Sequence, residues 1–181
     1  VVHLAVMAKQ PLPGKAKTRL APALGADGAA RLAARLLDHA LAQAARAAIG
    51  PVTLYLDPDA AHEPTQAAAR DLGIDVQAQG GGDLGQRMER LLGAGLQRAR
   101  GAVVMGTDAP GLDAALLQAA AAGLAGHDAV IVPALDGGFV LLGLTRCPPG
   151  LLQGLRWSHA DVLRDTQARL SAAGLSCLEL P

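Results

Sequence analysis

This chain of 181 residues is poor in aromatic side chains and has no net charge. It contains one Trp, one Tyr and one Phe, and its 16 Lys and Arg residues balance its 16 Asp and Glu residues. A protein with neither a basic surface nor aromatic side chains for base stacking lacks the usual means of binding nucleic acid. We therefore expect no nucleic-acid partner.

Long apolar runs and clustered metal ligands are also missing. No stretch reaches the roughly eighteen residues of a membrane-spanning helix, and no signal-peptide pattern is present. Cys147 and Cys177 lie far apart without a CxxC pair, which favours free thiols in a reducing compartment. The five histidines show no paired spacing, so no zinc site is predicted. We expect a cytoplasmic protein that does not contact a membrane.

Apolar residues, by contrast, make up 51% of the chain. Its length fits one domain, 1–181, that buries a full core. Strand-like and helix-like segments alternate, which is typical of an α/β protein with a mostly parallel sheet and helices on both faces. The predicted strands are His3–Ala8, Val52–Tyr55, Ile74–Ala78, Ala102–Gly106, Ala129–Pro133, Phe139–Leu144 and Cys177–Leu180. The predicted helices are Asp27–Ala48, Pro64–Leu72, Leu84–Ala99, Asp113–Leu124 and Ser158–Ala173.

Two of these strands are too close together for a helix between them. Ala129–Pro133 and Phe139–Leu144 flank a short segment with an Asp-Gly pair, which is typical of a hairpin. The sheet is therefore expected to be mixed, with one antiparallel strand.

The first predicted strand runs into a loop rich in cations. These cations are Lys9, Lys15, Lys17 and Arg19. They occupy alternate or near-alternate positions, which face one way in an extended loop. Ligands of open α/β sheets bind at the carboxyl ends of strands, and clustered cations there indicate a polyphosphate. A solvated charge run with a plain Pro-Gly turn is the alternative. A P-loop is excluded, because Lys9 stands where its first glycine would be.

Two further loops also hold charged candidate residues, and we expect Asp108 to lie at the same edge of the sheet as the cationic loop. Asp108 directly follows the central buried strand, where it could hold a divalent cation against phosphate oxygens or serve only as a turn residue. Arg87 lies in the first turn of a helix after three glycines, with Asp83 as the N-cap. The helix dipole disfavours a cation there unless an anion offsets it, which favours a functional interpretation of Arg87.

The last two candidates lie in the second half of the chain. Asp136 precedes two glycines and is either part of a hairpin turn or a carboxylate exposed to a substrate. Trp157 is either a core residue or a lid over a substrate. Ser158 and Asp161 after it form a pair typical of a capping box at the start of a helix.

Five ordered segments together resemble a known family. They are MAKQPLPGKAKTRLAPALG, GGDLGQRM, GTDAP, PALDGGFVLLGL and RWSHADVLRDTQARLSAAGL. Across nearly the whole chain they are similar to small stand-alone bacterial GT-A-like proteins of the nucleotide-diphospho-sugar transferase superfamily. Members are often labelled glycosyltransferases, some linked to arsenosugar biosynthesis. The opening loop is also similar to that of molybdenum-cofactor guanylyltransferases.

The resemblance implies a three-layer, Rossmann-like GT-A fold and a set of site residues. Lys9, Gly14, Lys17 and Arg19 match the diphosphate-facing loop, Gly85 and Arg87 the second nucleotide-side segment, and Asp108 the aspartate that binds a divalent metal, Mg²⁺ or Mn²⁺. Asp136, Gly137, Gly138, Phe139 and Trp157 match the acceptor side. Three positions depart from the family pattern: Phe139 replaces a Tyr, His159 replaces a Thr, and Asp108 stands alone instead of in a DxD pair.

Three functions are consistent with this pattern. The first is glycosyl transfer from a nucleotide sugar to a small-molecule acceptor, in which Lys17 and Arg19 neutralise the leaving group and Asp136 orients the acceptor or takes its proton. The second is nucleotidyl transfer from a nucleoside triphosphate to a phosphorylated acceptor, with release of pyrophosphate. The third is non-catalytic nucleotide binding. The base, the sugar, the acceptor and the oligomeric state are not predicted by the sequence.

Overall fold

The computed structural model describes all residues, 1–181. Its strands are β1 (Val2–Lys9), β2 (Val52–Asp57), β3 (Asp75–Ala78), β4 (Gly101–Met105), β5 (Ala129–Pro133), β6 (Phe139–Leu144) and β7 (Cys177–Glu179). Its α-helices are α1 (Ala21–Ala47), α2 (Glu63–Asp71), α3 (Leu84–Leu96), α4 (Ala114–Gly123) and α5 (Val162–Ala172), and a 3-10 turn spans Thr18–Leu20. None of these helices combines the length and the hydropathy that crossing a bilayer requires.

All seven strands form one mixed sheet in the order β3-β2-β1-β4-β6-β5-β7. β6 runs antiparallel to both of its neighbours, β4 and β5, and all the other strand pairs are parallel. The connection from β5 to β6 is too short for the crossover that a parallel pair needs, so the chain reverses there. The prediction of a mostly parallel sheet with one antiparallel strand is confirmed.

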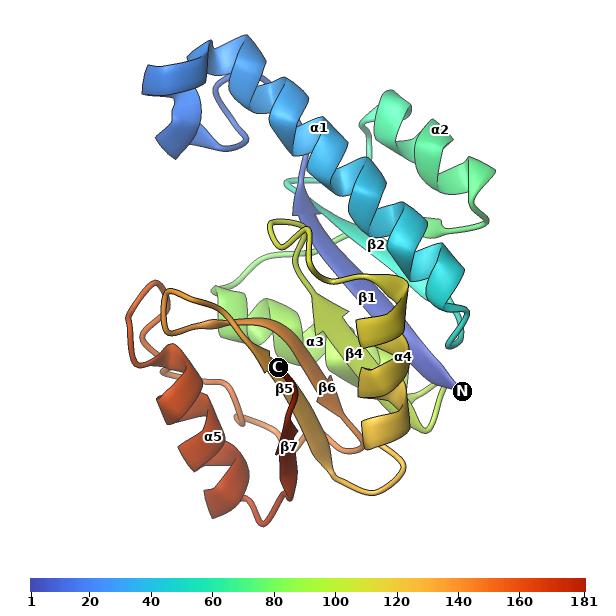
Figure 1. Cartoon of the computed structure of the whole chain (residues 1–181), viewed down its shortest axis with the longest axis vertical. Helices are drawn as coiled ribbons and strands as arrows, with labels where there is room; N and C mark the ends of the chain where they lie inside the picture. The colour runs from blue at the N-terminus through green and yellow to red at the C-terminus, as the bar shows by residue number, and fades with distance from the viewer.

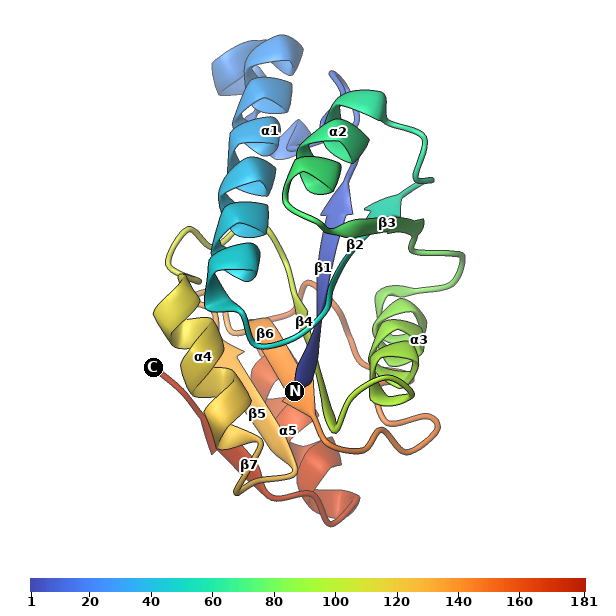
Figure 2. The same ribbon diagram turned by 90° about the vertical axis from the view of Figure 1, so that its right-hand side faces the viewer.

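Helices cover both faces of the sheet and make three layers (Figures 1 and 2). α1, α2 and α4 contribute to the core on one face, and α3 and α5 contribute to the core on the other. Successive side chains of β1 alternate between the two, with Leu4 and Val6 in the first core and Ala5 in the second. β4, at the centre of the sheet, is buried along its whole length, as predicted for the strand before Asp108.

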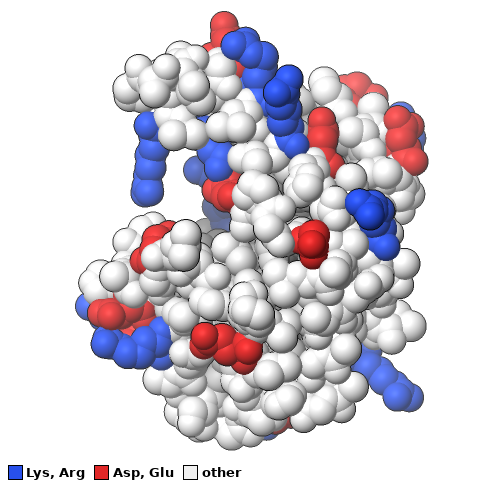
Figure 3. Space-filling model, in the orientation of Figure 1, with Lys and Arg blue, Asp and Glu red and all other residues white.

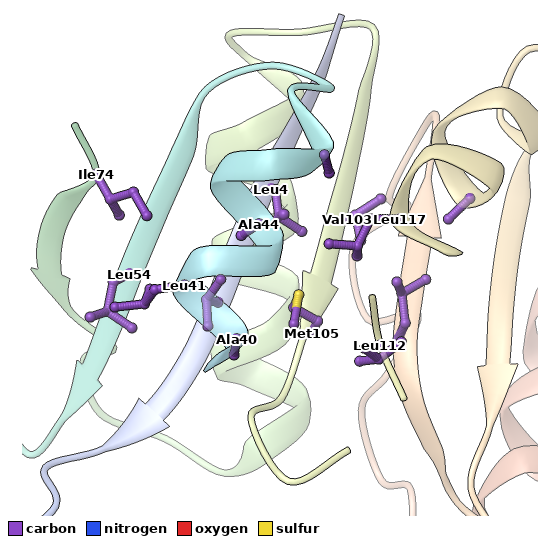
Figure 4. Packing of buried hydrophobic residues seen from close by; sticks show 14 of the residues in the cluster. Leu4, Ala40, Leu41, Ala44, Leu54, Ile74, Val103, Met105, Leu112 and Leu117 are labelled. Carbon is purple, nitrogen blue, oxygen red and sulfur yellow. The ribbon is translucent and has the colours of Figure 1, made fainter. Parts of the chain in front are cut away.

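α1 packs across the first face through small and branched side chains. Ala40, Leu41 and Ala44 of this helix belong to the same buried cluster as Leu4 and Val103 of the strands beneath it (Figure 4). The expected helix Asp27–Ala48 matches the regular part of α1. The helix also extends back to Ala21 across a break at Gly25, whose φ of 71° and ψ of 163° are not helical.

The start of α5 differs from the prediction. The helix begins at Val162 rather than at Ser158, and Asp161 makes no side-chain capping hydrogen bond. Ser158 has a left-handed backbone with a φ of 58° and belongs to the loop before the helix. The predicted capping box is therefore wrong. Asp161 instead forms ion pairs with Arg156 and Arg164.

The opening loop is not extended either. The backbone N–H groups of Lys15 and Ala16 both donate to the carbonyl of Leu12, at 3.1 Å, which folds the chain into a tight turn. Lys17 then has a φ of 52° and leads into the 3-10 turn. The segment 12–24 projects past the end of the sheet (Figure 1). The prediction of an extended loop with alternating side chains is wrong. The tight turn and the 3-10 turn bring the cations together instead.

Candidate functional site

A cleft of about 1130 Å³ opens at the edge of the sheet where β1 and β4 end. Its walls come from the opening loop, the loop after β4, the β5–β6 hairpin and the segment before α5. Figure 3 shows a hollow in this face beneath the projecting segment, and Lys and Arg side chains of that segment border the hollow. Because β6 is reversed, the hairpin lies at the same edge as the carboxyl ends of the parallel strands, where ligands of such sheets bind.

Nine of the predicted site residues line this cleft. They are Lys9, Lys17, Arg19, Arg87, Asp108, Asp136, Gly138, Phe139 and Trp157. Gly14, Gly85 and Gly137 are not among the lining residues and lie in the loops and helix that support it. The structure thus brings most of the predicted residues together, and their chemical roles stay predictions.

Lys17 and Asp108 form an ion pair across the floor of the cleft. Nζ of Lys17 lies 2.5 Å from Oδ1 of Asp108. The side chain of Lys17 is 20% exposed and that of Asp108 is 74% exposed, so the carboxylate remains open to the cleft. The pair joins the loops that follow β1 and β4, which are adjacent parallel strands. The expectation that both residues lie at one edge of the sheet is confirmed.

Arg87 is held by groups of the protein itself. Its Nη1 lies 3.2 Å from Oδ1 of Asp57 and donates to Oε1 of Gln79, also at 3.2 Å. Its Nε donates to the carbonyl of Gly82 at 2.9 Å. The anion that offsets a cation in the first turn of α3 is therefore the carboxylate at the end of β2. Sequence reasoning missed both partners, because Asp57 is distant along the chain and the contact with Gln79 depends on the fold of the glycine-rich loop between them.

Gln79, which accepts from Arg87 of α3, also binds the backbone of β1 and β2. It is buried, and its Nε2 donates to the carbonyls of Ala8 and Tyr55, at 3.1 and 3.2 Å. α3 then begins with a complete capping box, in which the Asp83 side chain accepts from the N–H of Gln86 and the Gln86 side chain accepts from the N–H of Asp83. The predicted N-cap Asp83 is confirmed. The glycine-rich loop is fixed at both ends by these bonds.

Three other cations that line the cleft have no ion-pair partner. They are Lys9, Lys15 and Arg19, and all three are exposed. Their charges are free to meet a ligand. Asp136, from the hairpin, is also exposed and without an ion pair, and its Oδ1 accepts only the N–H of Gly138, at 3.0 Å.

The hairpin turn that carries Asp136 rests on the segment before α5 and on the first turn of α5. The carbonyl of Gly137 accepts the N–H of Leu163 at 2.9 Å. Gly137 has a φ of 90°, and a Cβ at this position would overlap the carbonyl of Ala160. Only glycine fits this close approach, because both its backbone conformation and the space exclude a side chain. Gly137 therefore fixes the position of the hairpin turn against this segment.

Trp157 and Phe139 form the aromatic part of the cleft. Their ring centroids are 6.2 Å apart with an interplanar angle of 71°, an edge-to-face pair. Both are half-buried, packing on the core below and lining the cleft above. Gly85 makes room for this arrangement, since a Cβ there would collide with the carbonyl of Leu152 and lie 3.3 Å from the Trp157 ring.

The two cysteines take no part in the cleft. Both are free thiols, as predicted, and neither lines the cavity. Burial, followed by the charge of Glu89, raises the pKa of Cys147 to about 11, so this thiol stays protonated at neutral pH. Such a thiol is a poor nucleophile and a poor metal ligand.

Asp108 remains the candidate metal ligand. No group of three or more His, Cys, Asp or Glu side chains is arranged to hold a metal ion by itself. Mg²⁺ is commonly bound by only one or two carboxylates, with water and substrate phosphates completing its shell. An exposed carboxylate that already faces the ammonium of Lys17 fits this kind of site.

Comparison with known proteins agrees with this geometry. The family described as "Uncharacterized protein conserved in bacteria (DUF2064)" matches residues 21–159. The chain belongs to this family. No curated relative matches it.

This DUF2064 member is also similar to several solved structures. A candidate nucleotide-diphospho-sugar transferase from Desulfovibrio desulfuricans G20 is 32% identical, with a TM-score of 0.83 over 99% of this chain and 79% of that one. A cytidylyltransferase from Leptospira borgpetersenii serovar Hardjo-bovis has a TM-score of 0.63 and 14% identity over 99% and 75% of the two chains. A manganese complex of Rv0371c from Mycobacterium tuberculosis H37Rv has a TM-score of 0.55 and 19% identity over 99% and 86%.

The second and third of these structures show likeness of fold alone. The first is similar in sequence as well, across nearly the whole of this chain. The first confirms the predicted superfamily and the transferase class, and all three confirm the Rossmann-like α/β fold.

Proposed function

We propose that this protein transfers a glycosyl group from a nucleotide sugar to a small acceptor. The observation that carries the proposal is the distribution of unpaired charge around one cleft. Lys9, Lys15 and Arg19 are free cations on the side of the opening loop, and Asp136 is a free carboxylate on the side of the hairpin. A diphosphate suits the first side, and a hydroxyl that must lose a proton suits the second.

The donor would lie along the ends of β1, β2 and β4. Charge-assisted hydrogen bonds from the free cations would hold its diphosphate. The nucleoside would extend toward the glycine-rich loop, which Arg87 and Gln79 fix in place. A loop that is already fixed loses little conformational entropy when the ligand binds.

The chemical step is a substitution at the anomeric carbon. The acceptor oxygen forms a bond to this carbon while the bond from the carbon to the diphosphate oxygen breaks. The electron pair of the broken bond leaves on the nucleoside diphosphate, and the acceptor proton passes to the Asp136 carboxylate and then to water. Lys17 and Arg19 stabilise the negative charge that grows on the leaving diphosphate.

A divalent metal, Mg²⁺ or Mn²⁺, fits beside this diphosphate. When bound, it would supply further positive charge to the leaving group. Asp108 would hold it through a carboxylate oxygen. Lys17, which now neutralises that carboxylate, would then be free to contact the phosphates.

Nucleotidyl transfer is the second candidate, and Asp108 favours it, since the segment GTDAP holds a single Asp instead of a DxD pair. In this reaction a phosphate oxygen of the acceptor forms a bond to the α-phosphorus of a nucleoside triphosphate. The bond from that phosphorus to the bridging oxygen breaks, and pyrophosphate leaves with the electron pair. The acceptor would then be a phosphorylated molecule.

One assay separates these functions. The protein is first screened with nucleoside triphosphates, nucleoside diphosphates and nucleotide sugars, with and without Mg²⁺ or Mn²⁺, for ligands that raise its melting temperature. The nucleotides found are then incubated with acceptor mixtures, and nucleoside diphosphate and pyrophosphate are measured. We expect nucleoside diphosphate from a nucleotide sugar, and much less of it from Asp136→Asn. Pyrophosphate from a triphosphate would favour the second function, and binding without turnover would favour a non-catalytic role.

A further inference from the structure

The charges that line the cleft are divided between its two walls. Five cations line it, and all of them come from the end of β1, the opening loop after it or α3. They are Lys9, Lys15, Lys17, Arg19 and Arg87. Two are neutralised, Lys17 by Asp108 and Arg87 by Asp57, which leaves three positive charges on this wall.

The opposite wall, formed by the hairpin and the segment before α5, contains no Lys or Arg that faces the cleft. Its one free charge is the negative charge of Asp136. Arg156 lies beside this segment, but it does not line the cavity and it pairs with Asp165 at 3.4 Å. His159 does line the wall, and its Nδ1 lies 3.5 Å from Oδ2 of Asp161, so even a protonated imidazole has a carboxylate next to it.

We infer that the acceptor is an uncharged polyhydroxylated molecule, a sugar or a polyol without a phosphate or carboxylate group. This inference rests on the proposed function and names the acceptor class of the same site. An anionic group on this wall would find no cation and would be repelled by Asp136. Repulsion between like charges in a partly enclosed cleft is stronger than in bulk water.

The remaining side chains of the wall suit such a molecule. The edge-to-face pair of Phe139 and Trp157 offers half-buried ring surface to the apolar C–H face of a sugar ring. The Asp136 carboxylate accepts only one hydrogen bond within the protein, so it has lone pairs left for hydroxyl groups. The hydroxyl of Ser158, exposed on the same wall, both donates and accepts.

Trp157 makes this wall directly observable, because it is the only Trp of the chain. Its fluorescence is followed during titration with D-glucose, D-mannose, D-galactose and myo-inositol. Each uncharged compound is compared with its monophosphate. A nucleoside diphosphate and Mg²⁺ are kept at saturation throughout, so that the free cations of the other wall are occupied and cannot bind the added phosphate.

At least one uncharged compound should change the fluorescence in a saturable way, and its monophosphate should bind about tenfold more weakly or worse. Asp136→Asn keeps an oxygen for the Gly138 N–H, so the hairpin should fold. This variant should lose most of the discrimination against the phosphate. Asp71→Asn makes the same charge change at an exposed residue outside the cleft and should behave like the wild type.

Two results would overturn the inference while leaving the proposed nucleotide site standing. One is tighter binding of the monophosphates, which would move the acceptor to the phosphorylated class. The other is no response to any uncharged compound in protein that binds the nucleotide by calorimetry. Failure of every nucleotide to bind in that calorimetric measurement would overturn the proposed function itself, and the inference with it.

Discussion

Lys17 and Asp108 neutralise one another at 2.5 Å, so each residue sets the charge that the other presents to a ligand. Neither belongs to a regular α-helix or strand, and their distance depends on two loops that follow adjacent strands. The pair is the point at which the phosphate and metal parts of the proposed site meet. Two substitutions separate their contributions.

Removal of a cation from the opening loop should weaken nucleotide binding. A charge-assisted contact to phosphate contributes roughly 1.5–3 kcal/mol, so Lys17→Ala and Arg19→Ala should each raise the Kd about tenfold or more. Lys17→Ala should have the larger effect, because it also leaves Asp108 unneutralised beside the phosphates. Calorimetric titration of the nucleotide measures both. Arg100→Ala, an exposed arginine outside the cleft, is the matched control. Unchanged affinity in both loop variants would argue for a merely solvated charge run.

Asp108→Asn should abolish the gain in nucleotide affinity that Mn²⁺ or Mg²⁺ produces. Asparagine keeps the shape and the turn-type hydrogen bonds of aspartate but loses the charge that a hard cation needs. Without metal, the variant should bind the nucleotide at least as well as the wild type, since Lys17 is no longer held by a carboxylate. Titrations with and without Mn²⁺ measure this gain. An equal gain in both proteins would exclude Asp108 as an essential ligand.

Local residue roles were predictable where the partner is near in sequence. Asp83 was expected as an N-cap, and its side chain accepts the backbone N–H of Gln86, three residues ahead. Ser158 shows the opposite case, because its backbone is left-handed, with a φ of 58°, and α5 begins only at Val162. The pairing of Arg87 with Asp57 depends on the fold of two distant segments, which a single sequence does not disclose.

Among the elements, the β5–β6 hairpin depends most on a single backbone position. Gly137→Ala should destabilise the protein, because alanine is strained at a φ of 90° and its Cβ would overlap the carbonyl of Ala160. Gly174→Ala is the matched control, since it has a φ of 69° and open space around the Cβ position. The control should cost about 1–2 kcal/mol from its backbone alone. Denaturant unfolding should show a clearly larger loss for Gly137→Ala, and equal losses would mean that the contact with Ala160 has no effect.

The β1–β2 pair contains a buried histidine that should make stability depend on pH. His3 is fully buried, its Nε2 lies 3.0 Å from Oγ1 of Thr53, and its Nδ1 has no partner. Burial, and then the charge of Arg98, lowers the pKa of His3 below its ordinary value of 6.5. The folded protein therefore keeps His3 neutral in a pH range where the unfolded chain takes up a proton.

The sign of this effect follows from proton linkage. Because the unfolded state binds more protons below pH 6.5, the free energy of unfolding should fall as the pH drops from 6.5 toward the lowered pKa, with this contribution fully present above 6.5. Urea unfolding at several pH values between 8 and 5 measures this change in the free energy of unfolding. His3→Gln, which cannot be protonated, should lose this part of the slope. A slope unchanged by the substitution would show that other groups cause it.

At the scale of the whole molecule, we propose that residues 1–181 form one domain. The two buried clusters lie on opposite faces of the same seven-stranded sheet and draw on the same strands. Loss of β1 or β4 would disrupt both clusters at once. Urea unfolding should therefore give one transition, with coincident midpoints for Trp157 fluorescence and far-ultraviolet circular dichroism. Two separate midpoints would indicate two folding units.

The sheet was predictable because its signals are repeated along the chain. Alternating strands and helices indicated a parallel sheet, and the Asp-Gly pair before Phe139 indicated its one reversal. For the site, the sequence predicted only that the charged residues lie together at one edge of the sheet. The way in which Lys15 and Lys17 reach the cleft, through a tight turn and a left-handed residue, contradicts the extended loop that their spacing indicated.

The two walls of the cleft are consecutive in the chain. The wall that carries the cations is complete with the loop after β4, and the opposite wall begins only with the β5–β6 hairpin. Recombination between related genes near residues 124–128, in the turn after α4, would exchange one wall and keep the other. The new junction would include the backbone pairing between β4 and β6 and the side-chain packing of both buried clusters, so the exchanged halves must also match there. On the proposed function, a crossover that preserves this packing would give a protein a new acceptor and keep its donor.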